Sequence, residues 1–202
     1  METSAPQRPY HHGDLRRAIL SAALDVIAAD GPSALSLRDL ARRAGVSHAA
    51  PAHHFKDRTG LLTAIAAEGH ELLSATLAEA TDLRDAGVHY VRFAREHPAH
   101  FQVMFTPELL RENDLELTTA RALTADRLRT AVSTASGVSD EIDPRLAGIA
   151  AWSLAHGFAT LLLSHNLDGA IGAIGGVGAV GGQDPEEVFR TLTGMLFQSP
   201  SA

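Results

Sequence analysis

Residues 36–62 read SLRDLARRAGVSHAAPAHHFKDRTGLL, and this stretch decides the fold that the sequence predicts. Apolar residues recur at helical spacing through its first half, up to Gly45. A glycine at this place ends a helix easily, because it adopts the left-handed conformation at little cost. A second, short helix is expected over residues 48–55, with Pro51 near its first turn. Two short helices joined by such a turn are a common way to place one of them in the major groove of DNA.

Polar residues mark the helix ends around this pair. Ser36 is placed to cap the first helix, with Asp39 three residues on as an approximate capping box. Ser47 is placed to cap the second helix. Asp57 is placed to cap a third helix that begins at Arg58. The pattern therefore predicts helices in quick succession with short connections.

The flanking segments extend this helical pattern over the whole chain. An apolar stripe over residues 14–30, ended by Gly31 and Pro32, predicts a helix before the motif. After residue 58 helical signals continue and no alternating strand pattern persists. We therefore predict an all-α fold with a flexible arm at 1–13 and a helix-turn-helix domain at 14–57. The glycine-rich segment 168–183 is predicted to be a connector between two helices.

The charge distribution favours DNA contact at one end of the chain. The formal net charge is −7, but residues 1–60 carry eight Lys and Arg against six Asp and Glu. The rest of the chain carries nine basic and eighteen acidic residues. A mildly basic head on an acidic body fits a protein that meets nucleic acid with its head only.

The absence of cysteine and of a basic-plus-apolar signal peptide predicts a cytoplasmic protein. Residues 146–167 contain no Asp, Glu, Lys or Arg, which raises the possibility of a membrane span. The polar residues within the segment, such as His156 and Asn166, argue against it. A stripe of small residues runs through the segment from Ser153 to Ser164. A helix buried in an oligomer interface explains both features.

The sequence resembles the TetR/AcrR family of transcriptional regulators. The resemblance rests on YHHGDLRRAIL at 10–20, ALSLRDLARRAGVSHAAPAHHF at 34–55 and KDRTGLL at 56–62. Weaker similarity lies in HPAHFQVMF at 97–105 and in AWSLAHGFATLLL at 151–163. The last segment resembles the Trp-His-Gly subgroup of C-terminal domains.

The resemblance implies an all-α homodimer that binds operator DNA and a small-molecule effector. Residues 58–202 would then form the effector-binding and dimerisation domain. Two-fold symmetry implies a palindromic operator, and the reading we favour is a repressor released by its effector. An activator of the same family is the alternative, and a small all-α enzyme or carrier without DNA binding is a remote one. No cofactor is expected.

The residues expected at DNA lie in and around the short helix. The segment from Ser47 to residue 54 is expected to enter the major groove, with His48, Ala49, Ala50 and His53 nearest the bases. Those expected to hold phosphates are Arg38, Arg43, His54, Lys56 and Arg58. Two positions depart from the family pattern. Ala52 stands where an aromatic residue that contacts phosphate is usual, and Arg58 stands where Lys is usual.

The effector pocket and the dimer interface are harder to predict. A mixture of bulky apolar and occasional polar residues suggests a cavity wall formed by Phe93, His97, Phe101, Met104, Phe105, Trp152 and His156, with ordinary core packing as the alternative for each. The dimer interface is expected to include Ser153, Gly157, Thr160, Leu161, Ser164, Val188, Leu192 and Leu196. No metal site is expected, because the histidine pairs lack cysteine or carboxylate companions in a ligand-like pattern.

Overall fold

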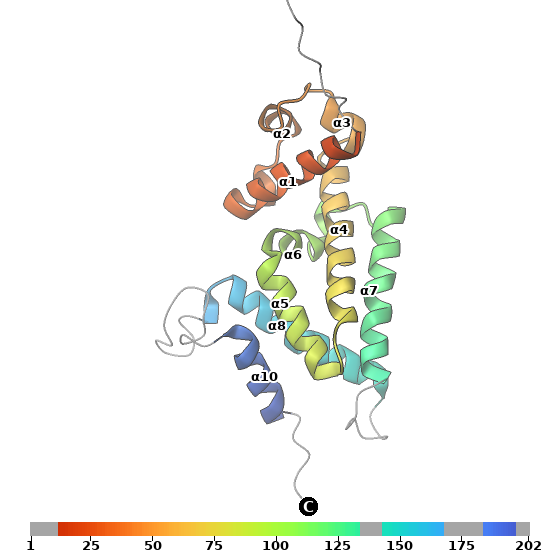
Figure 1. Ribbon diagram of the computed structural model, residues 1–202, viewed down its shortest axis with the longest axis vertical. Coiled ribbons are helices and arrows are strands. Elements are labelled where there is room, and N and C mark those ends of the chain that lie inside the picture. Colours follow the sequence, from red (N-terminus) through yellow and green to blue (C-terminus); the bar gives the residue numbers. More distant parts are fainter. Residues whose placement is uncertain (1–11, 134–142, 168–183, 197–202) are drawn as a thin grey trace, which may run out of the picture.

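The structure, a computed structural model, describes residues 12–133, 143–167 and 184–196. The described residues form helices and turns with no strand, which confirms the predicted all-α class (Figure 1). Of the predicted arm only residues 12 and 13 are described, and they begin the first helix. The predicted connector at 168–183 lies outside the described residues.

Three helices and a short 3-10 turn form the head at one end of the elongated molecule (Figure 1). They are α1 (His12–Asp30), η1 (Pro32–Ala34), α2 (Leu37–Arg43) and α3 (Ala50–Phe55). The glycine that ends α1 has a φ of 79°, a left-handed value that side chains disfavour. The predicted helix and its stop therefore agree with the structure.

A long helix, α4 (Arg58–Ala78), runs out of the head and becomes the centre of the body (Figure 1). Around it pack α5 (Leu83–Glu96), α6 (Pro98–Met104) and α7 (Leu115–Ser133), with η2 (Pro107–Leu109) between the last two. Buried residues occur on several sides of α4, because neighbours surround it. The same apolar core continues into the head, so head and body are packed together.

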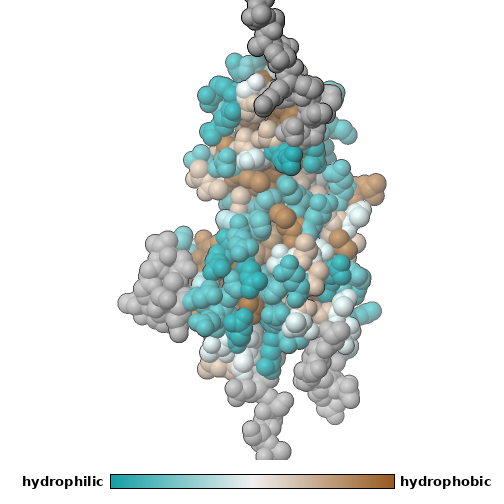
Figure 2. All heavy atoms as spheres, in the orientation of Figure 1, coloured by the Kyte–Doolittle hydropathy of each residue, from teal (hydrophilic) through white to brown (hydrophobic). Residues whose placement is uncertain are grey.

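The remaining helices form an outer layer on α5. They are α8 (Pro144–Leu163) and α10 (Pro185–Leu196), and a ring pair between Phe158 and Phe189 joins them. Hydrophilic residues cover most of the face over α5 in Figure 2. Asp143 caps α8, because its carboxylate accepts a hydrogen bond from the Arg145 amide at 2.8 Å.

An arginine pair fixes the start of α10 to α5. Arg92 donates from Nε and Nη2 to Oε2 of Glu186 at 3.0 and 2.8 Å, and Arg95 donates to Oε1 at 2.8 Å. Glu186 is buried, and these contacts compensate its charge. The outer layer therefore has a defined position on the body.

Candidate nucleic-acid interface and ligand cavity

The turn between α2 and α3 has the predicted glycine conformation. Gly45 has a φ of 65°, and the Val46 amide donates to the Ala41 carbonyl at 3.0 Å across the turn. Among the described residues, no atom lies within 4 Å of a side chain added at Gly45, so backbone conformation rather than space favours glycine there. The turn brings α3 back into contact with α2.

Two predicted caps are wrong in this motif. Ser36 precedes α2 but its side chain makes no cap hydrogen bond, and Asp39 instead pairs with two arginines of its own helix. Ser47 lies in the turn, because α3 begins only at Ala50 with Ala49 at the N-cap position. The second helix is thus two residues shorter at its start than the predicted 48–55.

The short helix α3 buries one face and exposes the other. Pro51 and Phe55 point into the head, and the Arg16 guanidinium lies 5.6 Å from the Phe55 ring centre. Of the residues predicted nearest the bases, His48, Ala49 and His53 are exposed and Ala50 is half-buried. Ser47, predicted to enter the groove with them, is also exposed. Alanine at position 52 is also exposed, so no long side chain extends from the middle of this surface.

The predicted phosphate contacts fall into two groups. Arg38 and Lys56 are exposed, and neither makes an ion pair or hydrogen bond through its side chain in the described part of the chain. Arg43 is exposed but its Nε donates to Asp39 at 2.6 Å. Hydrogen bonds from Arg42 and then Arg43 hold the pKa of Asp39 below its usual value. Arg43 must therefore share its charge with that carboxylate.

Arg58 and His54 are only half-exposed. The Nη2 atom of Arg58 donates to the Pro32 carbonyl at 2.6 Å, which ties the start of α4 to η1. This contact within the head is a structural role that the sequence did not predict for Arg58. The His54 ring packs edge-on to His53 and lies 6.2 Å from Phe55, centre to centre.

A tight turn joins α3 to α4. Lys56 has φ 68° and ψ −60°, and the Asp57 amide donates to the Phe55 carbonyl at 2.9 Å, which together describe a γ-turn. Asp57 then caps α4 as predicted, by accepting from the Gly60 amide at 2.9 Å. A side chain added at Gly60 would lie 2.0 Å from the Phe55 carbonyl oxygen. The geometry fixes α3 closely against α4.

A contact from the body strengthens this junction. Arg111, after η2, donates from Nη2 to Oδ2 of Asp57 at 2.6 Å, and its amide donates to the Thr63 hydroxyl at 3.0 Å. The Gly60 amide and Arg111 both lower the pKa of Asp57. These residues lie far apart in the sequence, so local patterns gave no indication of the contact.

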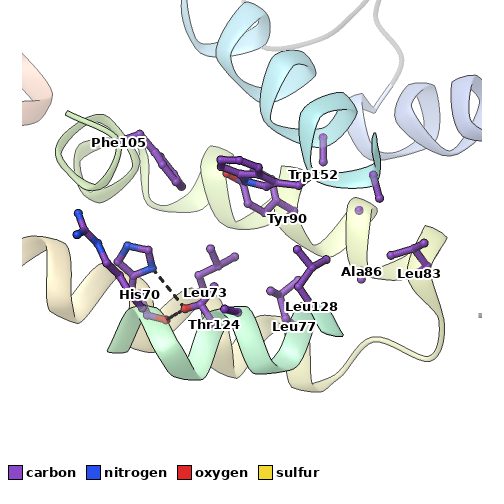
Figure 3. Close-up of a pocket in the computed structure, with 15 residues that line it drawn as sticks. His70, Leu73, Leu77, Leu83, Ala86, Tyr90, Phe105, Thr124, Leu128 and Trp152 are labelled. Atoms are coloured by element: carbon purple, nitrogen blue, oxygen red, sulfur yellow. Dashed lines mark hydrogen bonds between the residues drawn. The ribbon is translucent and has the colours of Figure 1, made fainter. Parts of the chain in front are cut away.

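The body contains a cavity of about 270 Å³ between α4 and α7 on one side and α5 and α8 on the other (Figure 3). Its walls are mainly apolar and belong to Leu73, Leu77, Leu83, Ala86, Gly87, Tyr90, Phe105, Ala125, Leu128, Ala151, Trp152 and Ala155. This volume lies near the lower end of the range for ligand sites.

One end of the cavity is polar and carries His70, Arg121 and Thr124. The Nδ1 atom of His70 lies 3.4 Å from the Thr124 hydroxyl (Figure 3). Burial, and next the nearby Arg121 charge, lower the pKa of His70 to about 4. His70 is therefore neutral near pH 7.

The structure places only Phe105 and Trp152, of the predicted pocket residues, on the cavity wall. His156 lies behind them, where its Nδ1 pairs with the Tyr90 hydroxyl at 2.8 Å and its ring stacks on Phe101 at 5.3 Å. Burial lowers the pKa of His156. Phe93, Phe101 and Met104 belong to the core, and His97 is half-buried against Phe93. None of these four residues lines the cavity.

The predicted dimer residues lie on α8 and α10 or at the end of α8, and most of those whose side chains are described are exposed. Leu161 is 44% exposed, Leu192 is 36% exposed, and Ser153, Thr160 and Ser164 are also exposed. Gly157 and Val188 are half-buried, and the Leu196 side chain lies outside the described residues. Further exposed apolar side chains extend this surface to Leu146, Ile149, Trp152 and Met195.

By length and composition α8 is also capable of crossing a membrane, and 22% of its apolar window is buried. A single helix of this kind is weak support for a span, since core and interface helices share these properties. The described residues contain no group of three or more His, Asp or Glu placed to hold a metal ion.

Family comparisons cover both halves of the chain. Residues 19–65 match the family model described as bacterial regulatory proteins, tetR family. Residues 83–196 match a tetracyclin repressor-like C-terminal domain. Neither match distinguishes the Trp-His-Gly subgroup, which stays a prediction. No relative was found among curated proteins.

Solved structures share the fold over nearly the whole chain. A protein with unknown function from Rhodococcus sp. RHA1 is 33% identical, with a TM-score of 0.73 over 95% of this chain and 97% of that one. The TetR family transcriptional regulator PfmR from Thermus thermophilus is 25% identical, with a TM-score of 0.63 over 91% and 99%. AibR, solved with isovaleryl coenzyme A and operator DNA, is 19% identical, with a TM-score of 0.64 over 91% and 98%.

Proposed function

The chain belongs to the TetR family of bacterial transcriptional regulators, and from this premise we propose that it is a homodimeric repressor released from a palindromic operator by a small molecule. Its class is that of a DNA-binding transcription factor with a ligand-binding C-terminal domain, and not that of an enzyme. The observation that carries the proposal is the exposed outer surface of α3 at the end of an elongated molecule (Figure 1).

In the proposed complex, α3 enters the major groove. Its small exposed alanines permit close approach, and His48 and His53 reach toward base edges. Arg38 and Lys56 hold phosphates, because both are exposed cations without a partner among the described residues. Arg43, His54 and Arg58 contribute less to phosphate binding. Each already makes a contact within the head, Arg43 with Asp39, Arg58 with the Pro32 carbonyl and His54 with His53. The domain boundary proposed at 57 and 58 falls at the γ-turn.

The proposed dimer forms through α8 and α10. Both helices expose large apolar side chains on the surface that carries the small-residue stripe. Covering this surface with the same surface of a second copy gives a two-fold symmetric pair, as closed dimers require. The two heads of that pair would read two similar half-sites.

Release by an effector is proposed to act through α4. The cavity lies against the body half of α4, and Asp57 and Arg111 connect the head end of that helix to the loop after α6. A ligand shifts the head only if it binds the released arrangement more tightly. The structure of AibR with both a coenzyme A ester and operator DNA shows that this fold accommodates both kinds of partner in that protein.

The experiment that tests the proposal begins with selection of bound sequences from random DNA by the full chain. A palindromic consensus is expected, and the absence of any enriched sequence would contradict the proposal. Gel shifts on that consensus then compare Lys56→Ala and Arg38→Ala with the original chain over a range of salt. Each variant removes one phosphate contact from each subunit, so the salt-dependence slope of the homodimer is expected to fall by about two.

Arg129→Ala is the matched control, because Arg129 is an exposed arginine on α7, in the body. It is expected to leave the slope unchanged. A reporter placed behind the selected operator then separates repression from activation. Reporter expression that rises when the regulator is present would favour the activator alternative.

A further inference from the structure

The polar end of the cavity contains a hydrogen-bonding atom without a partner. His70 is 7% exposed, and its Nε2 atom is buried and makes no hydrogen bond to any described residue. Figure 3 shows the ring between α4 and Phe105, with Nδ1 turned toward Thr124. An unpaired buried polar atom carries a cost that a ligand group can remove.

The contacts of Thr124 determine which nitrogen of His70 carries the proton. The Thr124 hydroxyl donates to the His70 carbonyl at 3.0 Å or to the Ala120 carbonyl at 3.1 Å. Its single proton is thus used, and the oxygen presents a lone pair to Nδ1. The neutral ring then has its proton on Nδ1, which leaves Nε2 as an acceptor. A ligand must bring a donor to Nε2.

The second polar group at this end of the cavity is Arg121, which needs a hydrogen-bond acceptor rather than a donor. Arg121 lines the cavity and lies on the same face of α7 as Thr124 and Leu128, at spacings of three and seven. It is half-buried, and its guanidinium forms no ion pair within residues 12–133, 143–167 and 184–196. A guanidinium offers only donors and binds carboxylates in a bidentate manner.

We propose that the cavity binds an amphipathic acid whose carboxylate pairs with Arg121 and whose neighbouring hydroxyl or amide N–H donates to Nε2 of His70. The proposal rests on the effector-binding role of this domain and specifies the chemical class of the effector. A purely apolar ligand leaves both groups unpaired. A simple carboxylate satisfies Arg121 only, because its oxygens would face the Nε2 lone pair.

The apolar walls of the cavity limit the length and shape of the ligand's apolar portion. From His70 to Leu77 is two turns of α4, or about 10 Å at the usual rise per residue. Leu73, Leu77 and Leu128 line this length, and Leu83 and Ala86 lie at the far end (Figure 3). An unbranched chain of medium length, or one ring with a short linker, fits these dimensions.

Four related compounds separate the two polar contacts. They are 3-hydroxyoctanoate, octanoate, and the methyl esters of both, measured by titration calorimetry on the full chain. The hydroxy acid is expected to bind at least tenfold more tightly than octanoate and than its own ester. Equal affinity for all four compounds, or binding of none of them, would overturn the proposal.

Two variants test whether Arg121 produces the preference for the acid and His70 the preference for the hydroxyl. Arg121→Gln is expected to remove the preference for acid over ester while keeping the preference for the hydroxyl. His70→Phe, which keeps a ring of similar size, is expected to do the reverse. Arg129→Gln changes an exposed arginine of the same helix that does not line the cavity, and both preferences should persist. Preferences that persist in the cavity variants would contradict the assignment.

Operator binding, measured on the same preparations, separates this inference from the proposed function. A chain that binds DNA but shows no preference among the compounds refutes the ligand class alone. A chain that shows the preferences but binds no DNA refutes the proposed function alone. If His70→Phe does not fold, the four compounds on the original chain and on Arg121→Gln still decide the outcome.

Discussion

Gly69 and Gly157 lie within helices of nearly equal length, α4 with 21 residues and α8 with 20, but their surroundings differ completely. A side chain added at Gly69 would meet Met104 Sδ at 2.5 Å and His100 Cβ at 3.1 Å. One added at Gly157 would meet no described atom within 4 Å. The first glycine permits α6 to pack closely on α4, whereas nothing described in the chain explains the second.

The difference extends along both helices. Neighbours of its own chain surround α4, while α8 has 22% of its apolar window buried and exposes Leu146, Ile149 and Leu161. Large exposed apolar surfaces indicate an interaction site. We therefore interpret α4 as the core of one subunit and α8 as part of a surface completed by a second copy.

The largest effect is expected at α4. Gly69→Leu should destabilise the fold by about 3 kcal/mol or more, because the added side chain must displace both Met104 and His100. Urea unfolding followed by circular dichroism measures the change. Gly69→Ala is the graded comparison and should cost less, since the Met104 side chain can move. A Leu variant as stable as the original chain would show that α6 does not pack closely on α4.

The next effect is expected at low pH, where protonation of the buried His70 on α4 should destabilise the fold. The pKa of His70 is about 4 in the folded chain, against about 6.5 when unfolded, so between these values the unfolded chain binds more protons. Stability should therefore fall as the pH is lowered from 6.5 toward 4, with His70 contributing about 3 kcal/mol of the loss. Burial lowers the pKa of His97 and His156 as well, which adds loss of the same sign.

Unfolding by urea at several pH values tests this expectation, with His70→Phe as the comparison. The variant should lose the part of the slope that His70 supplies and keep the part from the other histidines. Identical slopes in the two chains would mean that His70 is accessible to protons in the folded state.

The parts of the structure that the sequence predicted are local. Gly45 and Pro51 act through their own backbone conformation, and Asp57 reaches an amide only three residues away. Such signals lie within a few residues of their effects, so a pattern can reveal them. The errors at Ser36 and Ser47 show the limit, because a residue suited to capping makes no cap when the helix begins elsewhere or the side chain does not turn inward.

The cavity was not predictable in the same way. Its polar end joins His70 to Thr124, 54 residues away, and the predicted Phe93 and Met104 became core because α5 and α6 turn those faces inward. Which helix faces meet depends on packing over the whole body. The sequence spacing places Arg121, Thr124 and Leu128 on one face of α7. Only the packing of α4 beside that face shows that it lines a cavity.

A substitution on α8 is expected to have a smaller effect, and on dimerisation rather than on folding. Gly157→Leu should leave each subunit folded, because no described atom is displaced, but should raise the dimer dissociation constant at least tenfold, about 1.4 kcal/mol. Sedimentation at several concentrations measures it. Glu71→Leu adds the same side chain to an exposed position of α4 and should not change dissociation. An unaltered constant in Gly157→Leu would place the interface elsewhere.

The smallest expected effect compares the caps of the same two helices. Asp57→Ala removes a cap and the Arg111 ion pair, whereas Asp143→Ala removes one hydrogen bond to the Arg145 amide. We expect a loss of about 1 kcal/mol for the first and about half of that for the second.

A double-mutant cycle with Arg111→Ala isolates the ion pair from the cap. Coupling between Asp57 and Arg111 should be a few tenths of a kcal/mol for stability, since both side chains are partly exposed. It should be larger for operator affinity if the pair connects the body to the head. Coupling confined to stability would mean that the contact only holds α4 in place, and that the cavity must communicate with α3 by another route.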